Sequence, residues 1–272
     1  MFIKIDNDKL EKLLTERHPR AYIADLNNFR NLGNPMLAVR HMEGYLSEDG
    51  DLILISWLFF DGCQMYLEIK NEDNIDAAYE LFCDWLRDAK EYRFCTDSPE
   101  LFLNPRFISL FGKHEYEPSE QYGMFKAVSA PEADTHIRIV GIDDGTAVDA
   151  FDEDGDKYTA ELKSLYECTI KQPDPHSITY AYFDDDGSIA GYVGTNTFDD
   201  VYWDIANIYV RRDRRGHGIA TALAKYYAYD VTSRGKFASY GTPVNESSKH
   251  VAKSAGFEQF QLRYGTTWIA KT

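Results

Sequence analysis

The chain has 272 residues, of which 44% are hydrophobic and 14% aromatic, and this composition excludes a globally disordered protein. Its 29 Lys/Arg and 45 Asp/Glu give a formal net charge of −16, which is not the charge of a general nucleic-acid-binding protein. The sequence has no run of about 18 apolar residues, and its first residues lack the apolar core of a secretion signal. We therefore expect neither a membrane span nor export.

The charge is unevenly distributed along the chain. Residues 1–204 carry 18 Lys/Arg against 41 Asp/Glu, whereas residues 205–272 carry 11 Lys/Arg against 4 Asp/Glu. A basic segment within an acidic protein is typical of a site for one anionic ligand. The alternative at this point is a chance asymmetry between solvated faces.

The cysteines indicate neither a disulfide framework nor a metal site. None of the four forms a C-x-x-C pair, and no Cys/His cluster has the spacing of zinc ligands. We expect buried thiols in a reducing cytoplasm and no metal cofactor. The cysteines are Cys63, Cys83, Cys95 and Cys168.

The first half of the chain contains strand and helix patterns in alternation. Apolar stretches around a SEDGD turn predict a hairpin over 37–60, and an amphipathic period predicts a helix over 74–89. The other predicted elements are strands at 64–69, 91–96 and 122–128 and a short helix at 105–112.

A boundary between two domains is predicted near residues 129–135. This segment carries Pro131 with small and acidic residues, and it separates two alternating runs. We therefore expect two α/β domains, residues 1–130 and residues 135–272.

The second half shows a clearer series of elements. Residues 177–198 indicate a hairpin around the acidic turn DDDG, and the run 201–210 indicates a mostly buried strand rich in Tyr, Trp and Ile. Good helix formers over 220–229 predict a helix that Gly235 ends. The other predicted elements are strands at 136–142, 236–244 and 261–270 and helices at 146–152, 157–170 and 245–257.

The order of elements in the first half resembles the order in the second. The segment RFISLFGKHE in the first half is similar in position and pattern to HVAKSAGFEQ in the second. An internal duplication is one interpretation, and the frequency of strand–helix alternation in α/β proteins is the other. As a copy, the first half would lack the glycine-bearing loop of the second.

That loop follows the strand 201–210 and opens the next helix. Its sequence, Arg215-Gly216-His217-Gly218-Ile219-Ala220, places glycines where a helix begins. The unpaired N–H groups of a helix N-terminus attract phosphate, and glycine lets a phosphate approach the backbone. We therefore expect a diphosphate site. The arginines that would add charge for the outer phosphates are Arg211, Arg212, Arg214 and Arg215.

Two common diphosphate motifs fit this loop poorly. A dinucleotide fingerprint requires a third glycine where this chain has Thr221, and the Walker A pattern G-x-x-x-x-G-K-[ST] is absent. The loop instead resembles the acetyl-CoA signature of the GNAT acetyltransferase superfamily, Q/R-x-x-G-x-G/A, at Arg215, Gly218 and Ala220.

The surrounding residues extend this resemblance to about residues 136–272. Tyr209-Val210 ends the preceding strand, Asn245 begins the last helix, and Gly256-Phe257 ends it, as in the family. The resemblance implies a GNAT-like α/β fold, in which helices flank a central mixed sheet. The duplication would make the preceding α/β domain a degenerate copy of this fold.

The resemblance also implies a set of acetyl-CoA contacts. The backbone of Ile208, Tyr209 and Val210 would pair with the pantetheine arm. Asn245 would contact the pantetheine or the acyl end, although helix capping alone is a sufficient role for it. The residues that would hold the pyrophosphate are Arg215, Gly216, His217, Gly218, Ile219 and Ala220. We interpret His217 as a polar loop residue or a phosphate contact, not a metal ligand.

The implied reaction transfers the acetyl group to a neutral amine, mainly by positioning it. A backbone N–H near Ile208–Val210 would bind the oxyanion. Asp204, inside an apolar strand, is the candidate base, directly or through water, because burial would raise its pKa. A structural or solvent-facing role is the alternative for Asp204.

The general acid is less defined by the sequence. The family's usual Tyr position in the last helix is Ala252 in this chain. Tyr264 is the candidate substitute, with Tyr240 and His250 also near in sequence, and packing or surface roles are the alternative for all three. A thiol with a pKa of about 8.5 leaves tolerably well without an acid.

The acceptor is expected to be cationic. Residues 141–204 hold 16 Asp/Glu against 3 Lys/Arg, and an acidic surface attracts amines, either of a small molecule or of a lysine. The first domain is expected to shape this pocket or to mediate a homodimer. Besides the N-acetyltransferase, a non-catalytic acyl-CoA-binding or sensing protein and a nucleotide-binding regulator stay open as functions.

Overall fold

A computed structural model describes most of the chain. The described residues are 1–16, 22–33, 39–58, 62–86, 91–124, 126–130, 136–151, 157–171, 177–197, 202–266 and 269–270. They form two compact units: residues 1–120 with 261–272, and residues 121–260. The sequence places the boundary near 129–135 instead, and residues 131–135 of that linker lie outside the described part. None of the described helices is long and apolar enough to cross a membrane.

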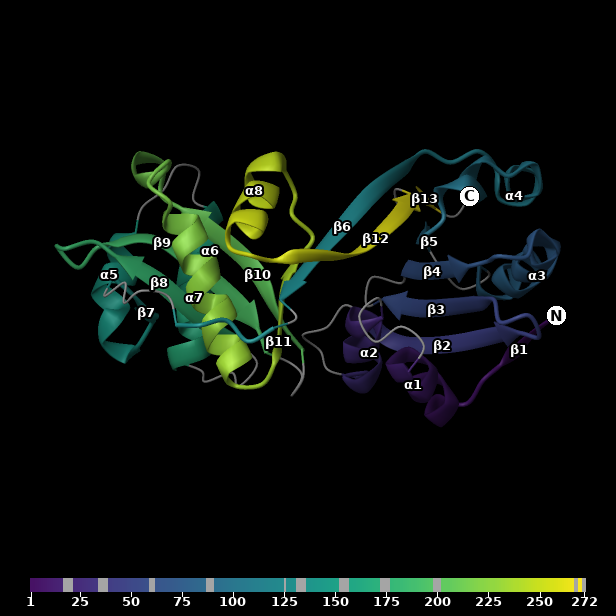
Figure 1. The fold of residues 1–272 in the computed structure, drawn as a ribbon, viewed down its shortest axis with the longest axis horizontal. Helices are drawn as coiled ribbons and strands as arrows, with labels where there is room; N and C mark the ends of the chain where they lie inside the picture. The colour runs from purple at the N-terminus through teal and green to yellow at the C-terminus, as the bar shows by residue number, and fades with distance from the viewer. Residues whose placement is uncertain are drawn as a thin grey trace. The chain divides into compact units, whose positions relative to one another are not determined.

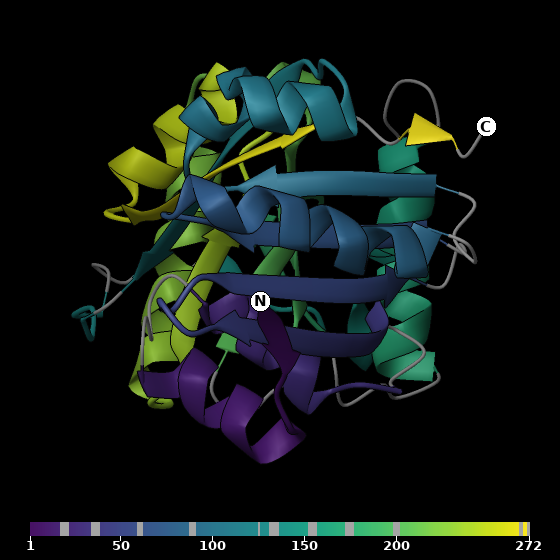
Figure 2. The same ribbon diagram turned by 90° about the vertical axis from the view of Figure 1, so that its right-hand side faces the viewer.

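The first unit is an α/β sheet with helices on both faces. Its strands lie in the order β1-β2-β3-β4-β5-β12, and only β4 and β5 pair in parallel. Figure 2 shows the neighbouring strands of this unit side by side, in purple to blue. The strands are β1 (Phe2–Lys4), β2 (Val39–Ser47), β3 (Leu52–Leu58), β4 (Gly62–Glu68), β5 (Glu91–Thr96), the end of β12 (Glu258–Thr266) and β13 (Ile269–Ala270), which pairs with β5.

The apolar sequence of β3 follows from burial on both of its faces. Leu52 and Leu54 pack under α1 and α2, while Ile53 and Ile55 pack under α3 and α4. Successive side chains of a strand point to opposite faces, so a strand covered on both sides is continuously apolar. The helices are α1 (Asn7–Glu16), α2 (Ile23–Arg30), α3 (Ile75–Leu86) and α4 (Pro105–Phe111).

The second unit has the same construction. Its strands lie in the order β6-β11-β10-β9-β8-β7, and only β10 and β11 pair in parallel. Helices α5 and α6 pack on one face of this sheet, and α7 and α8 on the other (Figure 1). The elements are β6 (Tyr116–Met124, through its end), β7 (Ile137–Ile139), α5 (Gly145–Ala150), α6 (Lys157–Tyr166), β8 (Ser177–Phe183), β9 (Ile189–Asn196), β10 (Tyr202–Val210), α7 (Ile219–Ser233), β11 (Phe237–Gly241) and α8 (Glu246–Ser254).

The order of elements confirms the predicted internal duplication. In the described residues, β-α-α-β-β-β-α-β-α-β occurs from β1 to β6 and again from β7 to β12. The last strand of each repeat pairs with a strand of the other repeat. Residues 122–124 of β6 pair with β11, and Tyr264 and Gly265 of β12 pair with β5.

Several element boundaries differ from the predictions. The strand predicted over 122–128 is β6, which begins at Tyr116 and ends at Met124. The helix predicted over 157–170 is α6, which continues as a π-helical turn over Glu167–Lys171. Helices α1 and α2 were not predicted. In α1, Leu10 and Leu14 are buried and Leu13 packs partly buried beside them, but these three leucines stand in a short, otherwise polar segment.

A buried ion pair holds the chain's C-terminal segment in the first unit. Arg263 of β12 donates to both carboxylate oxygens of Asp25 of α2, at 3.2 Å for the Nη1–Oδ1 bond, and its guanidinium lies 4.3 Å from the centre of the Tyr66 ring. Asp25 and Arg263 are 7% and 8% exposed. A buried charge that loses its partner is strongly destabilising.

Arg263→Ala should therefore lower the free energy of unfolding of the first unit by about 3–5 kcal/mol. The double variant Asp25→Ala/Arg263→Ala should lower it by less. Chemical denaturation measures both. Arg106→Ala is the matched control, because Arg106 also binds two carboxylates, at 2.9 and 2.6 Å, but at an exposed site, where solvent screens the ion pairs and the loss should be much smaller. Equal losses for Arg263→Ala and Arg106→Ala would contradict this account.

Candidate functional site

Strands β10 and β11 begin as a parallel pair and then part. Their paired positions are Tyr202 with Phe237, Trp203 with Ala238, and Asp204 with Ser239. Beyond Asp204, β10 continues to pair with β9 as far as Val210, but no pairing with β11 is present in the described residues. Beyond Asp204, the edge of β10 that is turned towards β11 therefore has no strand partner among the described residues, and we call the region beside this unpaired edge the gap.

The orientation of the β10 backbone shows which groups face this gap. Arg211 directly follows β10, and its N–H donates to the carbonyl of Ala190 in β9. Backbone groups alternate along an antiparallel strand, so Tyr209 also faces β9, whereas Ile208 and Val210 face the gap. The predicted pantetheine contacts at Ile208 and Val210 thus lie at the gap.

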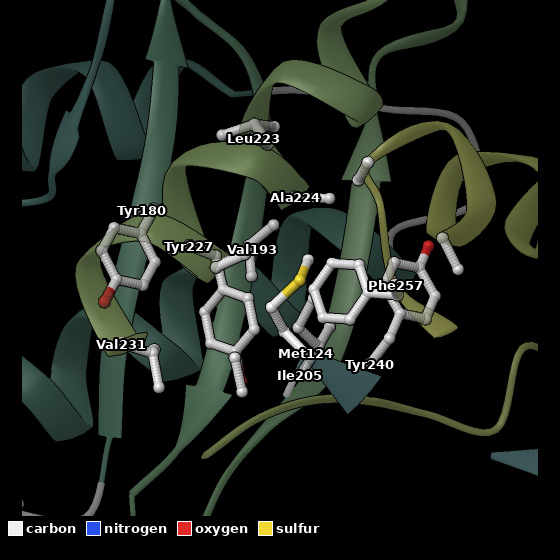
Figure 3. Close-up of a cluster of buried hydrophobic side chains, with 14 of the residues drawn as sticks. Met124, Tyr180, Val193, Ile205, Leu223, Ala224, Tyr227, Val231, Tyr240 and Phe257 are labelled. Carbon is white, nitrogen blue, oxygen red and sulfur yellow. The ribbon is translucent and has the colours of Figure 1, made fainter. Parts of the chain in front are cut away.

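Two features stabilise β10 where it leaves β11. The Tyr227 hydroxyl of α7 lies 2.8 Å from the Trp203 carbonyl and 3.1 Å from the Ser239 carbonyl, so it bridges the strands just before they part. Figure 3 shows Tyr227 within the buried cluster that joins α7 to the sheet. A register shift follows between Ile205 and Asn207, and the Asn207 side chain accepts a hydrogen bond from the Gly194 N–H at 3.1 Å. Such bulges occur often beside active sites.

The glycine loop lies directly after β10 and shows the geometry expected of an anion site. Gly216 and Gly218 have φ angles of 79° and 78°, which a residue with a Cβ adopts only with strain. A Cβ added at Gly218 would have no described atom within 4 Å. The first N–H bonded inside α7 is that of Ala222, to the Gly218 carbonyl, so the preceding N–H groups of the first turn are available to a ligand.

The arginines of the loop differ from the prediction that they serve outer phosphates. Arg214 binds Asp184 at 2.6 and 2.9 Å, and Arg211 binds Asp213 at 2.7 and 2.9 Å. Arg215 points back to β10, where it donates to the Val210 carbonyl and to the Tyr209 hydroxyl, both at 3.0 Å. In this conformation these three side chains brace the loop, and the backbone N–H groups are what it offers to an anion.

His217 and Asn245 also have structural partners. The His217 Nδ1 lies 2.9 Å from the Arg215 carbonyl and 3.2 Å from the Arg214 carbonyl, so it donates within the loop. Asn245 is the N-cap of α8, and its side chain accepts from the Ser248 N–H at 2.9 Å. In the described residues, no group of three or more His, Cys, Asp or Glu side chains is placed to hold a metal.

Asp204 stands at the last paired position before the gap. The residue is partly exposed, but its Oδ1 atom is buried and accepts no hydrogen bond from any described residue. Burial raises the pKa of Asp204 to about 7, although hydrogen bonds from the Ser239 hydroxyl and the Ile205 N–H favour its charged form. A carboxyl group whose pKa lies near neutral pH suits proton transfer.

The candidate acids are less well placed. Tyr264 belongs to the first unit, where it packs edge-to-face on Tyr116 with ring centres 5.6 Å apart, so neither compact unit brings it together with Asp204. The Tyr240 hydroxyl is occupied by Ser248 at 3.2 Å, and His250 is exposed. Ala252 is fully buried in the core beside α7. An acid role for Tyr264 stays a prediction.

The equivalent region of the first unit is closed. Strands β4 and β5 pair at six consecutive positions, from Gly62–Glu91 to Leu67–Thr96, and do not part. The loop before α3 lacks glycine, and at its start the buried Asp51 carboxylate accepts from the N–H groups of Lys70 and Asn71 at 2.9 and 3.2 Å. The first unit thus has neither the unpaired strand edge nor the glycine loop of the second.

Sequence reasoning missed Ser239, Tyr202, Tyr227 and Asp51. The first three act through contacts between elements, and nothing in the local pattern marks them. Asp51 could have been noticed from its position in the turn between β2 and β3. Asp184 lies in the equivalent turn, between β8 and β9, and binds Arg214 of the loop after β10.

Comparisons with known proteins agree with this arrangement. Residues 145–257 match the family model described as the acetyltransferase (GNAT) family. No curated protein matches the chain.

Several solved structures share the fold along the whole chain, all at low sequence identity. A GCN5-related N-acetyltransferase from Sphaerobacter thermophilus is 15% identical, with a TM-score of 0.53 over 99% of this chain and 95% of that one. A tandem GNAT protein from the clavulanic acid biosynthesis pathway is 14% identical, with a TM-score of 0.51 over 98% of both chains. A Drosophila protein is 13% identical, with a TM-score of 0.54 over 97% of both. At these identities the likeness concerns the fold alone.

Proposed function

We propose that this chain, whose C-terminal half is a domain of the GNAT acetyltransferase family, binds acetyl-CoA between β10 and β11 and transfers the acetyl group to a primary amine. The observation that carries the proposal is that β10 and β11 stop pairing after Asp204, and that the unpaired part of β10 leads into the glycine loop. It lies within the segment that matches the family model, residues 145–257.

The gap and the loop suit different parts of acetyl-CoA. The pantetheine arm carries amide groups that can pair with a strand edge, and Ile208 and Val210 offer such an edge. The pyrophosphate would lie on the loop from Arg215 to Ala220, where glycines and the open first turn of α7 present N–H groups. Asn245, at the start of α8, would contact the pantetheine or the acyl end.

The reaction forms an amide and releases CoA thiol. The acceptor ammonium first loses a proton, and its neutral nitrogen attacks the thioester carbonyl. The nitrogen, now positively charged, then loses a second proton to water, and the carbon–sulfur bond breaks to release the thiolate. The N–H of Ile208 or Val210 would stabilise the oxyanion of the tetrahedral intermediate. Asp204 would take the proton from the amine, directly or by way of water. The thiolate then takes up a proton, from solvent or from an acid such as Tyr264.

The acceptor is proposed to be a cationic small molecule or a lysine side chain. Residues 141–204 hold 16 Asp/Glu against 3 Lys/Arg. Asp144 and Asp184 are occupied by Arg138 and Arg214, so the attraction would come from the remaining carboxylates. The protein would work in the cytoplasm, and the first unit would shape the acceptor side or form a homodimer.

A non-catalytic acyl-CoA sensor is the second candidate. The observation that favours it is Ala252, a fully buried methyl group at the family's usual Tyr position. The pKa of Asp204, raised by burial to about 7, favours catalysis instead.

Binding of acetyl-CoA is the first test. Acetyl-CoA at about 100 times its Kd should raise the melting temperature of the second unit by roughly 5 °C or more, and ATP or NAD should not. Calorimetry should find one acetyl-CoA per chain, because β4 and β5 of the first unit stay paired and leave no strand edge for the ligand. Absence of binding at millimolar acetyl-CoA would end the proposal, and two sites per chain would contradict the closed state of the first unit.

Gly218→Glu tests the phosphate loop. The new carboxylate would lie where the phosphates bind, and acetyl-CoA affinity should fall about 100-fold or more in calorimetry. Gly235→Glu is the matched control, because Gly235 also has a positive φ, 72°, with no described atom within 4 Å of an added Cβ. It lies at the other end of α7, roughly 22 Å away, and should bind acetyl-CoA as the wild type does. Equal affinities in the two variants would remove the loop from the site.

Asp204→Asn tests the base in a thiol-release assay with polyamine, aminoglycoside and lysine-peptide acceptors. Asp204 must be ionised to accept a proton, so wild-type kcat/KM should rise with pH through about 7. The variant should lose roughly 100-fold in kcat/KM and lack this inflection, with unchanged acetyl-CoA affinity. Unchanged kinetics would exclude Asp204 as base. Tight acetyl-CoA binding without thiol release from any acceptor would favour the sensor.

A further inference from the structure

We propose that Tyr158 is a positioning residue that links the acetyl-CoA loop to the acceptor side of the second unit. Acetyl-CoA bound on the loop orders the start of α6 through Arg215, Tyr209 and Tyr158, so that the acceptor binds more tightly after acetyl-CoA than before it. The inference rests on the proposed function and gives a role to a side chain on the face of the sheet opposite α7.

A chain of contacts runs from the loop to α6. The Arg215 side chain donates to the Tyr209 hydroxyl at 3.0 Å, and its guanidinium carbon lies 5.2 Å from the centre of the Tyr209 ring. The Tyr158 ring stacks on the Tyr209 ring, with ring centres 3.8 Å apart and planes 20° from parallel. Because Tyr158 is in the first turn of α6, these two contacts join the loop before α7 to a helix on the other face of the sheet.

Tyr209 is well placed to transmit order between the two sites. It lies in β10 between Ile208 and Val210, whose backbone groups face the gap. Its side chain is buried on the α6 side, where the Phe151 and Tyr192 rings also lie, with ring centres 6.5 and 6.3 Å away. A packed core has little free volume, so a ligand that fixes this part of β10 also restricts the ring that stacks on Tyr209.

The start of α6 carries a carboxylate that suits an amine. The Tyr192 hydroxyl lies 3.0 Å from the Tyr158 carbonyl and 3.2 Å from Glu161 Oε2, so the same contacts dock this part of the helix on β9. Glu161 is half-buried, and no Lys or Arg of the described residues forms an ion pair with it. It belongs to the acidic segment that is proposed to attract the acceptor. Ordering the start of α6 therefore fixes one of the carboxylates that an amine meets.

The rest of α6 is held independently of the loop. Leu162 and Tyr166 are buried in the cluster between α6 and the sheet, whereas Tyr158 is only half-buried. The first turn is thus the part of the helix whose order can depend on a ligand. When one ligand has already ordered this turn, the second loses less conformational entropy on binding, and linkage makes the gain in affinity mutual.

Hydrogen–deuterium exchange with and without acetyl-CoA tests this coupling without turnover. In the wild type, acetyl-CoA should slow amide exchange over the loop and the end of β10, and also about fivefold or more over residues 157–163. Tyr158→Leu removes the stacked ring, so the slowing should persist at the loop and disappear from α6. Tyr158→Phe retains the ring and should behave as the wild type does.

Tyr226→Leu is the matched control for loss of a tyrosine ring. Tyr226 is also a half-buried tyrosine of a helix, and it packs on a buried tyrosine of the sheet, Tyr180, with ring centres 5.8 Å apart. In this variant acetyl-CoA should still slow exchange over residues 157–163. In the thiol-release assay, Tyr158→Leu should raise the KM of the fastest acceptor about fivefold, while kcat and the Kd of acetyl-CoA without acceptor stay within about twofold.

Two exchange results would overturn the inference: slowing at the wild-type loop without slowing in α6, and slowing in α6 that survives in Tyr158→Leu. An acceptor KM that Tyr158→Leu leaves unchanged would also overturn it. A wild type in which acetyl-CoA slows exchange nowhere and shows no binding in calorimetry would instead overturn the proposed function.

Discussion

The second unit depends on two parallel strands that stop pairing halfway. Strand separation leaves backbone donors and acceptors without partners, which costs free energy unless other groups or a ligand satisfy them. The Tyr227 hydroxyl bridges the strands before they part, and Arg215 takes the carbonyl of Val210 at the far end of β10. The remaining edge, around Ile208, is open because its neighbours hold both ends of the strand in place. An extended ligand with amide groups would complete the sheet there.

The first unit shows what the same order of elements does without such a ligand. Its β4 and β5 pair along their whole length, and the loop that follows β4 has no glycine and is bound at its start by the buried Asp51 carboxylate. The first unit therefore satisfies its own strand edge and the start of this loop with groups of the chain. In the proposed function, the second unit would instead leave these groups for a ligand.

Local sequence patterns predicted most of the fold and part of the site. The hairpins, α7 with its stop at Gly235, the Asn245 cap and the glycines of the loop follow from turn chemistry, period and capping, which act over a few residues. The exchange of the last strands and the pairing of Arg214 with Asp184 could not be predicted, because both join segments far apart in sequence. Helices α1 and α2 were missed because both are short, at 10 and 8 residues, so that each offers few turns of a helical period. Arg214 looked available in sequence because its carboxylate partner, Asp184, lies 30 residues away along the chain.

Asp204 illustrates why a site residue is hard to recognise before its surroundings are known. In sequence it is one acidic residue in an apolar strand, and a structural role was an equally good interpretation. In the structure it is the last residue of β10 that still has a partner on β11. Its Oδ1 atom is buried without a hydrogen bond from any described residue, and burial raises the pKa of the carboxyl group to about 7. In the proposed function, the parting of the strands after Asp204 would determine both where acetyl-CoA binds and which carboxylate acts on the amine beside it.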